Sequence, residues 1–376
     1  MLIFSASTGG GHNQVASVLQ AELQANNYEV MISDFLKESN NLLHLIIASG
    51  YNNLAMRSAS LYGLLYHRSN NKTVDKRLKS ILSKCLRNTI SAQITSFKPD
   101  LIITTHPMVV NVLGGLKAFA RLQLPVISIV TDFAAHHMYF SKHIDAYITP
   151  YCIDTHNALL KGGIPENKIF PFGIPIKRDF YKQASNYSAD KRFSVLLMAG
   201  SLGSKYLVRV KNILLHNPYP LRIMVVCGKN YRLKTELESR CDKLALNKEI
   251  IVYGYCNNIS DLMDSAHLLI SKPGGITSSE AIAKILPLLI PYAIPGQEEE
   301  NARILVDNGL ALRVRSFKEI NDTVTGFIEN PDSLQKIARH MEAFNTGNAL
   351  DRLLELSDQL IDYHAPKTNL PYLIQK

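Results

Sequence analysis

The chain has 376 residues, of which 46% are hydrophobic and 19% charged, a composition typical of a globular protein with room for two or three domains. Its five cysteines form no CxxC pair, which disfavours both a disulfide framework and a cysteine zinc site. The opening MLIFSASTGGGH has neither a basic segment nor a long apolar run, and no apolar stretch approaches the ~20 residues of a membrane span. We therefore expect neither a signal peptide nor a spanning helix.

The first half alternates short apolar runs with helix-length amphipathic segments, a pattern typical of βαβ units and a parallel sheet. The expected strands cover residues 2–6, 28–33, 101–105, 125–130 and 146–149, and the expected helices cover 12–26, 107–122 and 151–161. A stretch rich in proline, glycine and polar residues at 171–192 then predicts a domain boundary.

Residues 42–87 combine apolar and aromatic runs with a basic stretch. Between residues 57 and 98 there are nine basic side chains and one acidic side chain, and the net charge of the chain is +9. Apolar and aromatic side chains next to cations are typical of a surface that docks on anionic lipid. A buried helix followed by a solvated basic helix fits the same pattern. No nucleic-acid-binding motif is present, so we expect no nucleic-acid partner.

The alternation restarts after the boundary. The expected strands of the second half cover 193–200, 221–228, 249–254, 266–271 and 286–292, and a closing helix covers 350–364. We predict an α/β fold of two doubly wound, Rossmann-like parallel-sheet domains, 1–175 and 190–350, that face a central cleft. The segment 351–376 packs back on the first domain. Ligands of such sheets bind beyond the carboxyl ends of the strands, so site residues are sought in the loops that follow them.

The first such loop contains Gly9, Gly10 and Gly11. Glycines let backbone N–H groups approach a ligand, and the helix that they open favours anions. The loop lacks the GK[ST] of a Walker loop. A GxGxxG fingerprint fails at Gln14, although Asp34 would suit a ribose partner, so a dinucleotide site stays open.

Two further features of the first half bear on catalysis. His12, beside the glycine loop, is placed to remove a proton from a hydroxyl, unless it only hydrogen-bonds its own loop. The loop VTDFAAHHMYF holds Asp132, His136 and His137, which is a weak metal pattern without a partner elsewhere. Asp132 and His136 alternatively line the cleft and orient an acceptor or His12, or are structural.

Two loops of the second half suit phosphate. Gly200, Ser201 and Gly203 form a small-residue turn before a helix, which is fit for phosphate or is only a tight turn. The segment SKPGGITSSE opens a helix whose free N–H groups and hydroxyls favour a diphosphate. Its candidate residues are Pro273, Gly274, Gly275, Ile276, Thr277 and Ser278.

Polar side chains lie just beyond this diphosphate segment. Glu280 can accept hydrogen bonds from a pair of ribose hydroxyls. Gln297, Glu298 and Asn301 can bind a second polyhydroxylated group, or belong to a capped helix with solvated glutamates. The predicted ligand is a nucleoside diphosphate that carries a sugar. No DxD pair is present, which favours a leaving diphosphate stabilised by N–H groups without a metal.

Together these motifs resemble a known family. TGGGH, TDFAAHHMY, AGSLG and SKPGGITSSEAIA…PGQEEENA resemble the monogalactosyldiacylglycerol synthases and processive diacylglycerol β-glucosyltransferases, and more distantly the GlcNAc transferase that forms lipid II. The resemblance covers essentially the whole chain. It implies the GT-B fold, with the acceptor mostly on the first domain and the UDP-sugar mostly on the second, inversion at the anomeric carbon, and no metal or other cofactor.

The resemblance also implies roles for individual residues. Gly274, Gly275 and Thr277 would face the diphosphate, with Ser201 on a phosphate and Glu280 on the ribose. Gln297, Glu298 and Asn301 would face the hexose, and His12 would be the base. The turn 254–259 would hold uracil, so that the donor-binding set also takes in Gly228, Tyr255 and Ile259. Tyr139 stands where family members often have Trp.

The function implied is transfer of glucose or galactose from a UDP-hexose to the hydroxyl of diacylglycerol. A peripheral protein on the cytoplasmic face of the membrane would thereby make glycolipid. The alternatives are a transferase that uses UDP-GlcNAc or another UDP-sugar on a different lipid-linked or small acceptor, and a sugar epimerase of the same fold. From another class, a non-catalytic nucleotide-sugar-binding regulatory protein fits the same motifs.

Overall fold

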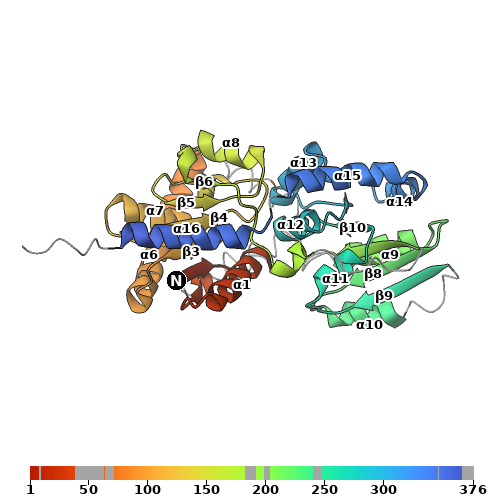
Figure 1. Cartoon of the computed structure of the whole chain (residues 1–376), viewed down its shortest axis with the longest axis horizontal. Helices are drawn as coiled ribbons and strands as arrows, with labels where there is room; N and C mark the ends of the chain where they lie inside the picture. The colour runs from red at the N-terminus through yellow and green to blue at the C-terminus, as the bar shows by residue number, and fades with distance from the viewer. Residues whose placement is uncertain are drawn as a thin grey trace, which may run out of the picture.

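The computed structural model contains two parallel β-sheets, each with helices on its faces (Figure 1). It describes residues 1–7, 10–38, 63, 72–182, 192–198, 204–239, 247–345 and 347–365, and for 72–83 and 204 the backbone only. The sheet of the first half has the order β2-β1-β3-β4-β5-β6, and that of the second half β12-β11-β10-β7-β8-β9. All neighbouring strands are parallel.

The first half comprises β1 to β6 with their helices. The strands are β1 (Leu2–Ser5), β2 (Met31–Asp34), β3 (Ile102–Thr104), β4 (Val126–Ile129), β5 (Ala146–Ile148) and β6 (Ile169–Phe170). The helices are α1 (Gly10–Ala25), α2 (Phe35–Glu38), α6 (Lys72–Phe97), α7 (Pro107–Ala118) and α8 (Ile153–Lys161), with 3₁₀ turns η2 (His137–Tyr139), η3 (Glu166–Lys168) and η4 (Arg178–Tyr181).

The second half comprises β7 to β12 with their helices, and a last helix follows it. The strands are β7 (Phe193–Met198), β8 (Leu221–Val226), β9 (Lys248–Tyr253), β10 (Leu268–Ser271), β11 (Leu288–Ile290) and β12 (Ala311–Arg313). The helices are α9 (Ser204–Leu214), α10 (Tyr231–Ser239), α11 (Ile259–Asp264), α12 (Gly275–Ala283), α13 (Gln297–Asp307), α14 (Glu319–Glu329), α15 (Pro331–Phe344) and α16 (Ala349–His364).

The prediction of two doubly wound parallel-sheet domains is confirmed, and each expected strand has its counterpart. Strands covered on both faces read as continuous apolar runs, and every residue of β1, β3 and β4 is buried. The sequence reading missed β6 and β12. β6 has two residues, and two of the three residues of β12 are exposed, so neither carries a long apolar run.

Each sheet has one switch point, the place where the order of its strands changes direction. In the first sheet the order reverses between β1 and β3, and in the second between β7 and β10. Ligands of doubly wound sheets bind at such points, beyond the carboxyl ends of the strands. The loops after β1 and β3, and the loop after β10, are therefore the places where this fold positions a site.

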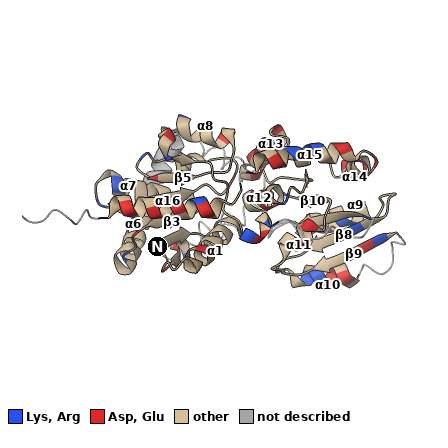
Figure 2. Ribbon diagram, viewed as in Figure 1, with Lys and Arg blue, Asp and Glu red and all other residues tan. Residues whose placement is uncertain are grey.

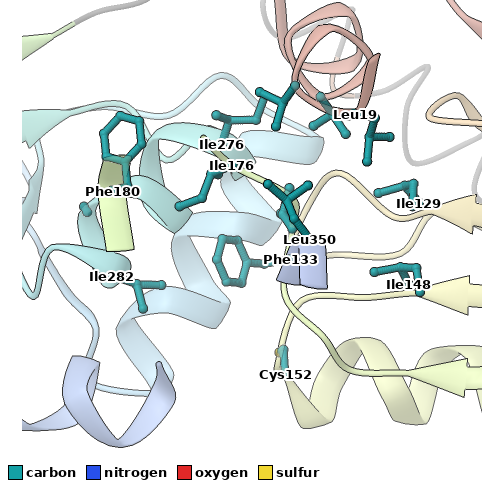
Figure 3. Close-up of a cluster of buried hydrophobic side chains, with 14 of the residues drawn as sticks. Leu19, Ile129, Phe133, Ile148, Cys152, Ile176, Phe180, Ile276, Ile282 and Leu350 are labelled. Carbon is teal, nitrogen blue, oxygen red and sulfur yellow. The ribbon is translucent and has the colours of Figure 1, made fainter. Parts of the chain in front are cut away.

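The two halves share a hydrophobic core. One buried cluster contains Leu19 of α1 and Phe133 after β4 in the first half, and Ile276 and Ile282 of α12 in the second (Figure 3). Ile176 and Phe180, which precede β7, belong to it too. Burial of an aliphatic or aromatic side chain of this size contributes about 1.5–3 kcal/mol, so the cluster stabilises the contact between the halves.

The chain returns to the first half at its end. α16 lies along the first half (Figure 1), where Tyr28 donates a hydrogen bond to Asp358. Arg178, in the 3₁₀ turn η4, pairs with Glu22 of α1 and with Asp351 of α16. The last helix and the segment between the sheets are thus held against α1.

The predicted lipid-docking segment 42–87 lies largely outside the described residues, apart from Gly63 and the start of α6. Figure 2 shows both basic and acidic residues along α15, whereas α14 carries acidic residues and no Lys or Arg. Within the described ranges, no helix is both long and apolar enough to cross a membrane.

Candidate active site

His12 lies in the first turn of α1, after β1. Its Nδ1 is 2.7 Å from the carbonyl oxygen of Thr105, which follows β3, and 3.1 Å from the Oγ1 of Thr131, which follows β4. Its ring also meets the ring of His106 edge to face, with centroids 4.6 Å apart. The parallel sheet brings these three loops together because the carboxyl ends of its strands share one edge. The partner of His12 is thus a neighbouring loop and not its own.

The geometry fixes the protonation of His12. Burial lowers the pKa of His12 to about 4, although the hydrogen bond to Thr105 opposes that shift. The imidazole is therefore neutral near pH 7, and its proton sits on Nδ1, because a carbonyl oxygen only accepts. Nε2 then carries the lone pair. This is the form of histidine that can accept a proton from a hydroxyl.

Asp132 also follows β4, but its hydrogen bonds lead to the second half. Gln297 donates to its Oδ2, and the Nδ2 of Asn301 donates to its Oδ1 over 2.9 Å. Burial raises the pKa of Asp132 to about 7, and the hydrogen bonds from Asn301 and Gln297 reduce that rise. Thr131, whose Oγ1 is 3.4 Å from Oδ2 of Asp132, joins it to His12. The contact between Asp132 and His12 therefore runs through Thr131, and the orientation of His12 by Asp132 remains a prediction.

His136 has a local structural role. Its Nδ1 accepts a hydrogen bond from the backbone N–H of Met138 at 3.2 Å, so the side chain caps the 3₁₀ turn η2. Its catalytic role remains a prediction. Among the described residues, no group of three or more His, Cys, Asp or Glu side chains is arranged to hold a metal ion.

The start of α12 faces the loop after β4. A methyl group added to Gly275 would lie 2.0 Å from the carbonyl oxygen of Thr131, so only glycine permits this approach. A methyl group on Gly11 would lie 3.7 Å from the Cδ1 of Ile276. Gly10 opens α1, and Gly274 is the N-cap of α12. The two glycine segments predicted from the sequence thus meet at the junction of the halves.

The polar residues of α12 are buried or half-buried. Thr277 is half-buried, and the fully buried hydroxyl of Ser278 has no hydrogen-bond partner among the residues that the structure describes. Glu280 is 5% exposed and accepts a hydrogen bond from Gln14 of α1, with 3.1 Å between Nε2 and Oε1. Burial raises the pKa of Glu280 to about 8, against the lowering effect of Lys177. A proton therefore resides on this carboxyl near neutral pH.

The turn before α13 is fixed by a charged pair. Gly296 has a φ of 101°, a backbone conformation that favours glycine. The next acidic residue, Glu298, pairs with Lys272 over 2.6 Å and accepts a hydrogen bond from the N–H of Ile294 over 3.1 Å. Its carboxylate thus joins the segment before α12 to the segment before α13. Hexose binding by Gln297, Glu298 and Asn301 remains a prediction.

The residues expected near the base of the nucleotide lie on neighbouring loops. Gly228 has a φ of 57° in the turn after β8. Tyr255 is 59% exposed after β9, with the Nζ of Lys229 5.4 Å from its ring centroid, and Ile259 begins α11. The other predicted site residues, Gly9, Gly200, Ser201 and Gly203, lie outside the described residues.

The sequence reading missed several residues that the fold brings to the junction. Thr105 and Thr131 contact His12, Gln14 contacts Glu280, and Lys272 contacts Glu298. The rule that parallel strands carry sites at their carboxyl ends could have identified the two threonines. Gln14 was noted only for breaking a glycine fingerprint.

Comparisons of the sequence identify the family. The family model for monogalactosyldiacylglycerol (MGDG) synthase matches residues 12–176, and that for the glycosyltransferase family 28 C-terminal domain matches residues 194–346. A processive diacylglycerol beta-glucosyltransferase of Bacillus licheniformis is 31% identical over 367 residues, which cover 94% of this chain and 93% of that protein.

Solved structures give the fold. MurG of Acinetobacter baumannii superposes with a TM-score of 0.64 at 16% identity, covering 95% of this chain and 99% of its own. The calicheamicin glycosyltransferase CalG4 superposes with a TM-score of 0.62 at 11% identity, covering 97% and 99%. The protein therefore has the expected GT-B fold, and it is a glycosyltransferase that belongs to the family of processive diacylglycerol β-glucosyltransferases.

Proposed function

We propose that the protein transfers a hexose, preferentially glucose, from its UDP-sugar to the hydroxyl of diacylglycerol, with inversion at the anomeric carbon. The names of the curated relatives favour diacylglycerol as acceptor and a β-glucoside as product. UDP-glucose carries its diphosphate in the α configuration, so a β product requires attack from the opposite face.

The observation that carries this proposal is the hydrogen bond from Nδ1 of His12 to the carbonyl of Thr105. It leaves Nε2 as an acceptor for the proton of the attacking hydroxyl. As that oxygen forms its bond to the anomeric carbon, the bond from that carbon to the diphosphate breaks. The proton passes to Nε2 of His12, and the bonding electron pair leaves with the diphosphate.

The start of α12 supports the leaving group. The backbone N–H groups at Gly275, Ile276 and Thr277 are in the first turn of a nine-residue helix and have no partner within that helix. We assign them, with the helix dipole and the segment that contains Ser201, to the charge that develops on the diphosphate. Under this proposal no metal ion takes part.

The division of labour follows the fold. We assign residues 1–175 to the acceptor and to docking on anionic lipid through residues 42–87. Residues 190–350 hold the UDP-sugar, and residues 351–376 close back on the first domain. A chain that works on diacylglycerol in this way would sit peripherally on the cytoplasmic face of the membrane.

The test is a transfer assay with the full chain. UDP-[¹⁴C]glucose or UDP-[¹⁴C]galactose is incubated with vesicles that contain diacylglycerol, in EDTA, and the lipids are then extracted. We expect label in the organic phase with UDP-glucose. Label that stays in a water-soluble product points to another acceptor, and UDP binding without transfer from either sugar points to a regulatory protein; either result contradicts the proposal.

A further inference from the structure

Asn301 joins three segments at the junction of the halves. Its side chain is 0% exposed on α13. Its Nδ2 donates to Oδ1 of Asp132 at 2.9 Å and to the carbonyl of Pro273 at 3.1 Å, and its Oδ1 accepts from the N–H of Ala134 at 3.1 Å. Both N–H donors of this amide are therefore used between protein groups, one in each half.

These contacts form a chain that ends at the base. Pro273 lies directly before the start of α12, where we place the leaving diphosphate. Asn301 connects it to Asp132, Thr131 connects Asp132 to His12, and Gln297 gives Asp132 a second amide donor. The same loop approaches α12 at Gly275. The loop after β4 thus contacts both the segment assigned to the leaving group and the histidine assigned to the proton.

The chemistry of the pair makes it sensitive to the contact between the halves. A carboxyl group removed from water needs its hydrogen-bond partners, and losing them leaves a buried polar group unpaired. Two of the partners of Asp132 come from α13, so they are present only when the second half lies against the first. Asp132 would therefore keep these two hydrogen bonds while the halves are in contact and would lose both if the halves separated.

We propose that Asn301 and Asp132 are positioning residues that tie the donor half to the acceptor half and set the distance between His12 and the leaving diphosphate. This inference rests on the proposed function. An in-line displacement depends on the relative placement of base and leaving group, and a misplacement of about 1 Å can cost about 100-fold in rate. UDP is assigned to the second half alone. Breaking the tie should therefore lower kcat and leave the Kd for UDP unchanged.

The experiment compares Asn301→Ala, Asp132→Ala and the double variant in the full chain. We expect each single variant to lower kcat by about 10- to 100-fold, with the Kd for UDP by calorimetry within about threefold of wild type. The double variant should be no slower than the slower single variant, because either change breaks the same tie. Asp132→Asn, which keeps one acceptor oxygen, should recover part of the rate. Glu299→Gln, on the same helix and in a carboxylate that pairs with Arg313 of the same half, is the control and should retain wild-type kcat.

A second measurement separates this inference from the proposed function. Small-angle X-ray scattering should give a larger radius of gyration for Asn301→Ala than for wild type. Unchanged kcat and radius would overturn the tie, and an unchanged radius with a rise in the KM for UDP-glucose that matches the loss of rate would make Asn301 a hexose ligand instead. If wild type transfers no hexose to diacylglycerol, the proposed function fails while the radius still decides the tie. If Asn301→Ala does not fold, Asp132→Asn supplies both readouts.

Discussion

The surroundings of His12 and those of the donor-side residues are built differently. His12 is held by Thr105 and Thr131, which come from loops of its own sheet. On the donor side, Glu280 is bonded to Gln14, and Gln297 and Asn301 are bonded to Asp132, all across the junction. The base is therefore held within one half, whereas the donor-side groups take their hydrogen-bond partners from the other half. His12 and the groups assigned to the leaving diphosphate therefore lie together only when the two halves are in contact.

The largest expected effect comes from removing the base. His12→Ala should lower kcat by about 10²–10⁴-fold, the usual cost of losing a general base. UDP affinity should stay near wild type, because the hydrogen-bond partners of this imidazole in the described part of the chain, Thr105 and Thr131, both lie in the first half. Turnover with radiolabelled donor and calorimetry with UDP check the two parts. Near-native turnover would show that another group accepts the proton.

A smaller loss is expected from keeping the halves apart. Gly275→Ala would place a methyl group 2.0 Å from the carbonyl of Thr131, which is backbone and cannot turn away. We expect a larger radius of gyration in scattering and a loss of turnover of about 10- to 100-fold. Gly274→Ala adds the same methyl group where nothing lies within 4 Å, so it is the matched control for the radius. Equal radii for the two variants would contradict a close contact at Gly275.

The affinity for UDP should depend on the carboxyl group of Glu280. If Glu280 accepts hydrogen bonds from the ribose, Glu280→Gln should weaken UDP binding by up to about tenfold, the upper end for one hydrogen bond between neutral groups. Binding should displace Gln14, its present donor. Calorimetry with UDP measures the change. An unchanged Kd would remove the ribose role and leave Glu280 as a contact between the halves.

The same substitution tests a pH dependence of stability. Burial raises the pKa of Glu280 from 4.5 to about 8, so the folded chain keeps a proton that the unfolded chain has released. Between these values the free energy of unfolding falls as pH rises, and burial of Asp132 acts in the same direction up to about 7. From about pH 5 to about pH 8, the urea midpoint should therefore fall less for Glu280→Gln than for wild type. Parallel pH profiles would contradict the raised pKa.

The features that sequence could predict are the local ones. Continuous apolar runs specified the strands, and the glycine pair before ITSSE placed the start of α12, which begins at Gly275. Strand-following loops were the right places to search, because parallel strands end at one edge. The predictions were therefore most accurate where a short segment carries its own physical signal.

The pairings across the junction could not be predicted from one chain. Gln14 and Glu280 are 266 residues apart, and Asp132 and Asn301 are 169 apart. No spacing rule relates such positions, because their contact depends on how two separately formed sheets dock. Glu298 is an example. A glutamate can accept hydrogen bonds from sugar hydroxyls, so the sequence suggested a hexose ligand, whereas in the fold its carboxylate pairs with Lys272.

The smallest effect is expected from the outer ties, by which we mean the ion pairs that join Arg178 to α1 and to α16. Arg178 donates to Glu22 at 2.8 and 2.6 Å and to Asp351 at 2.6 Å, but its side chain is 46% exposed. Exposed ion pairs contribute about 0–1 kcal/mol, because water and salt screen them. Arg178→Ala should therefore lower the free energy of unfolding by at most about 1 kcal/mol, with kcat unchanged, as measured by urea unfolding and the transfer assay. A loss of turnover comparable to that of Asn301→Ala would mean that the outer ties also set the distance between base and leaving group.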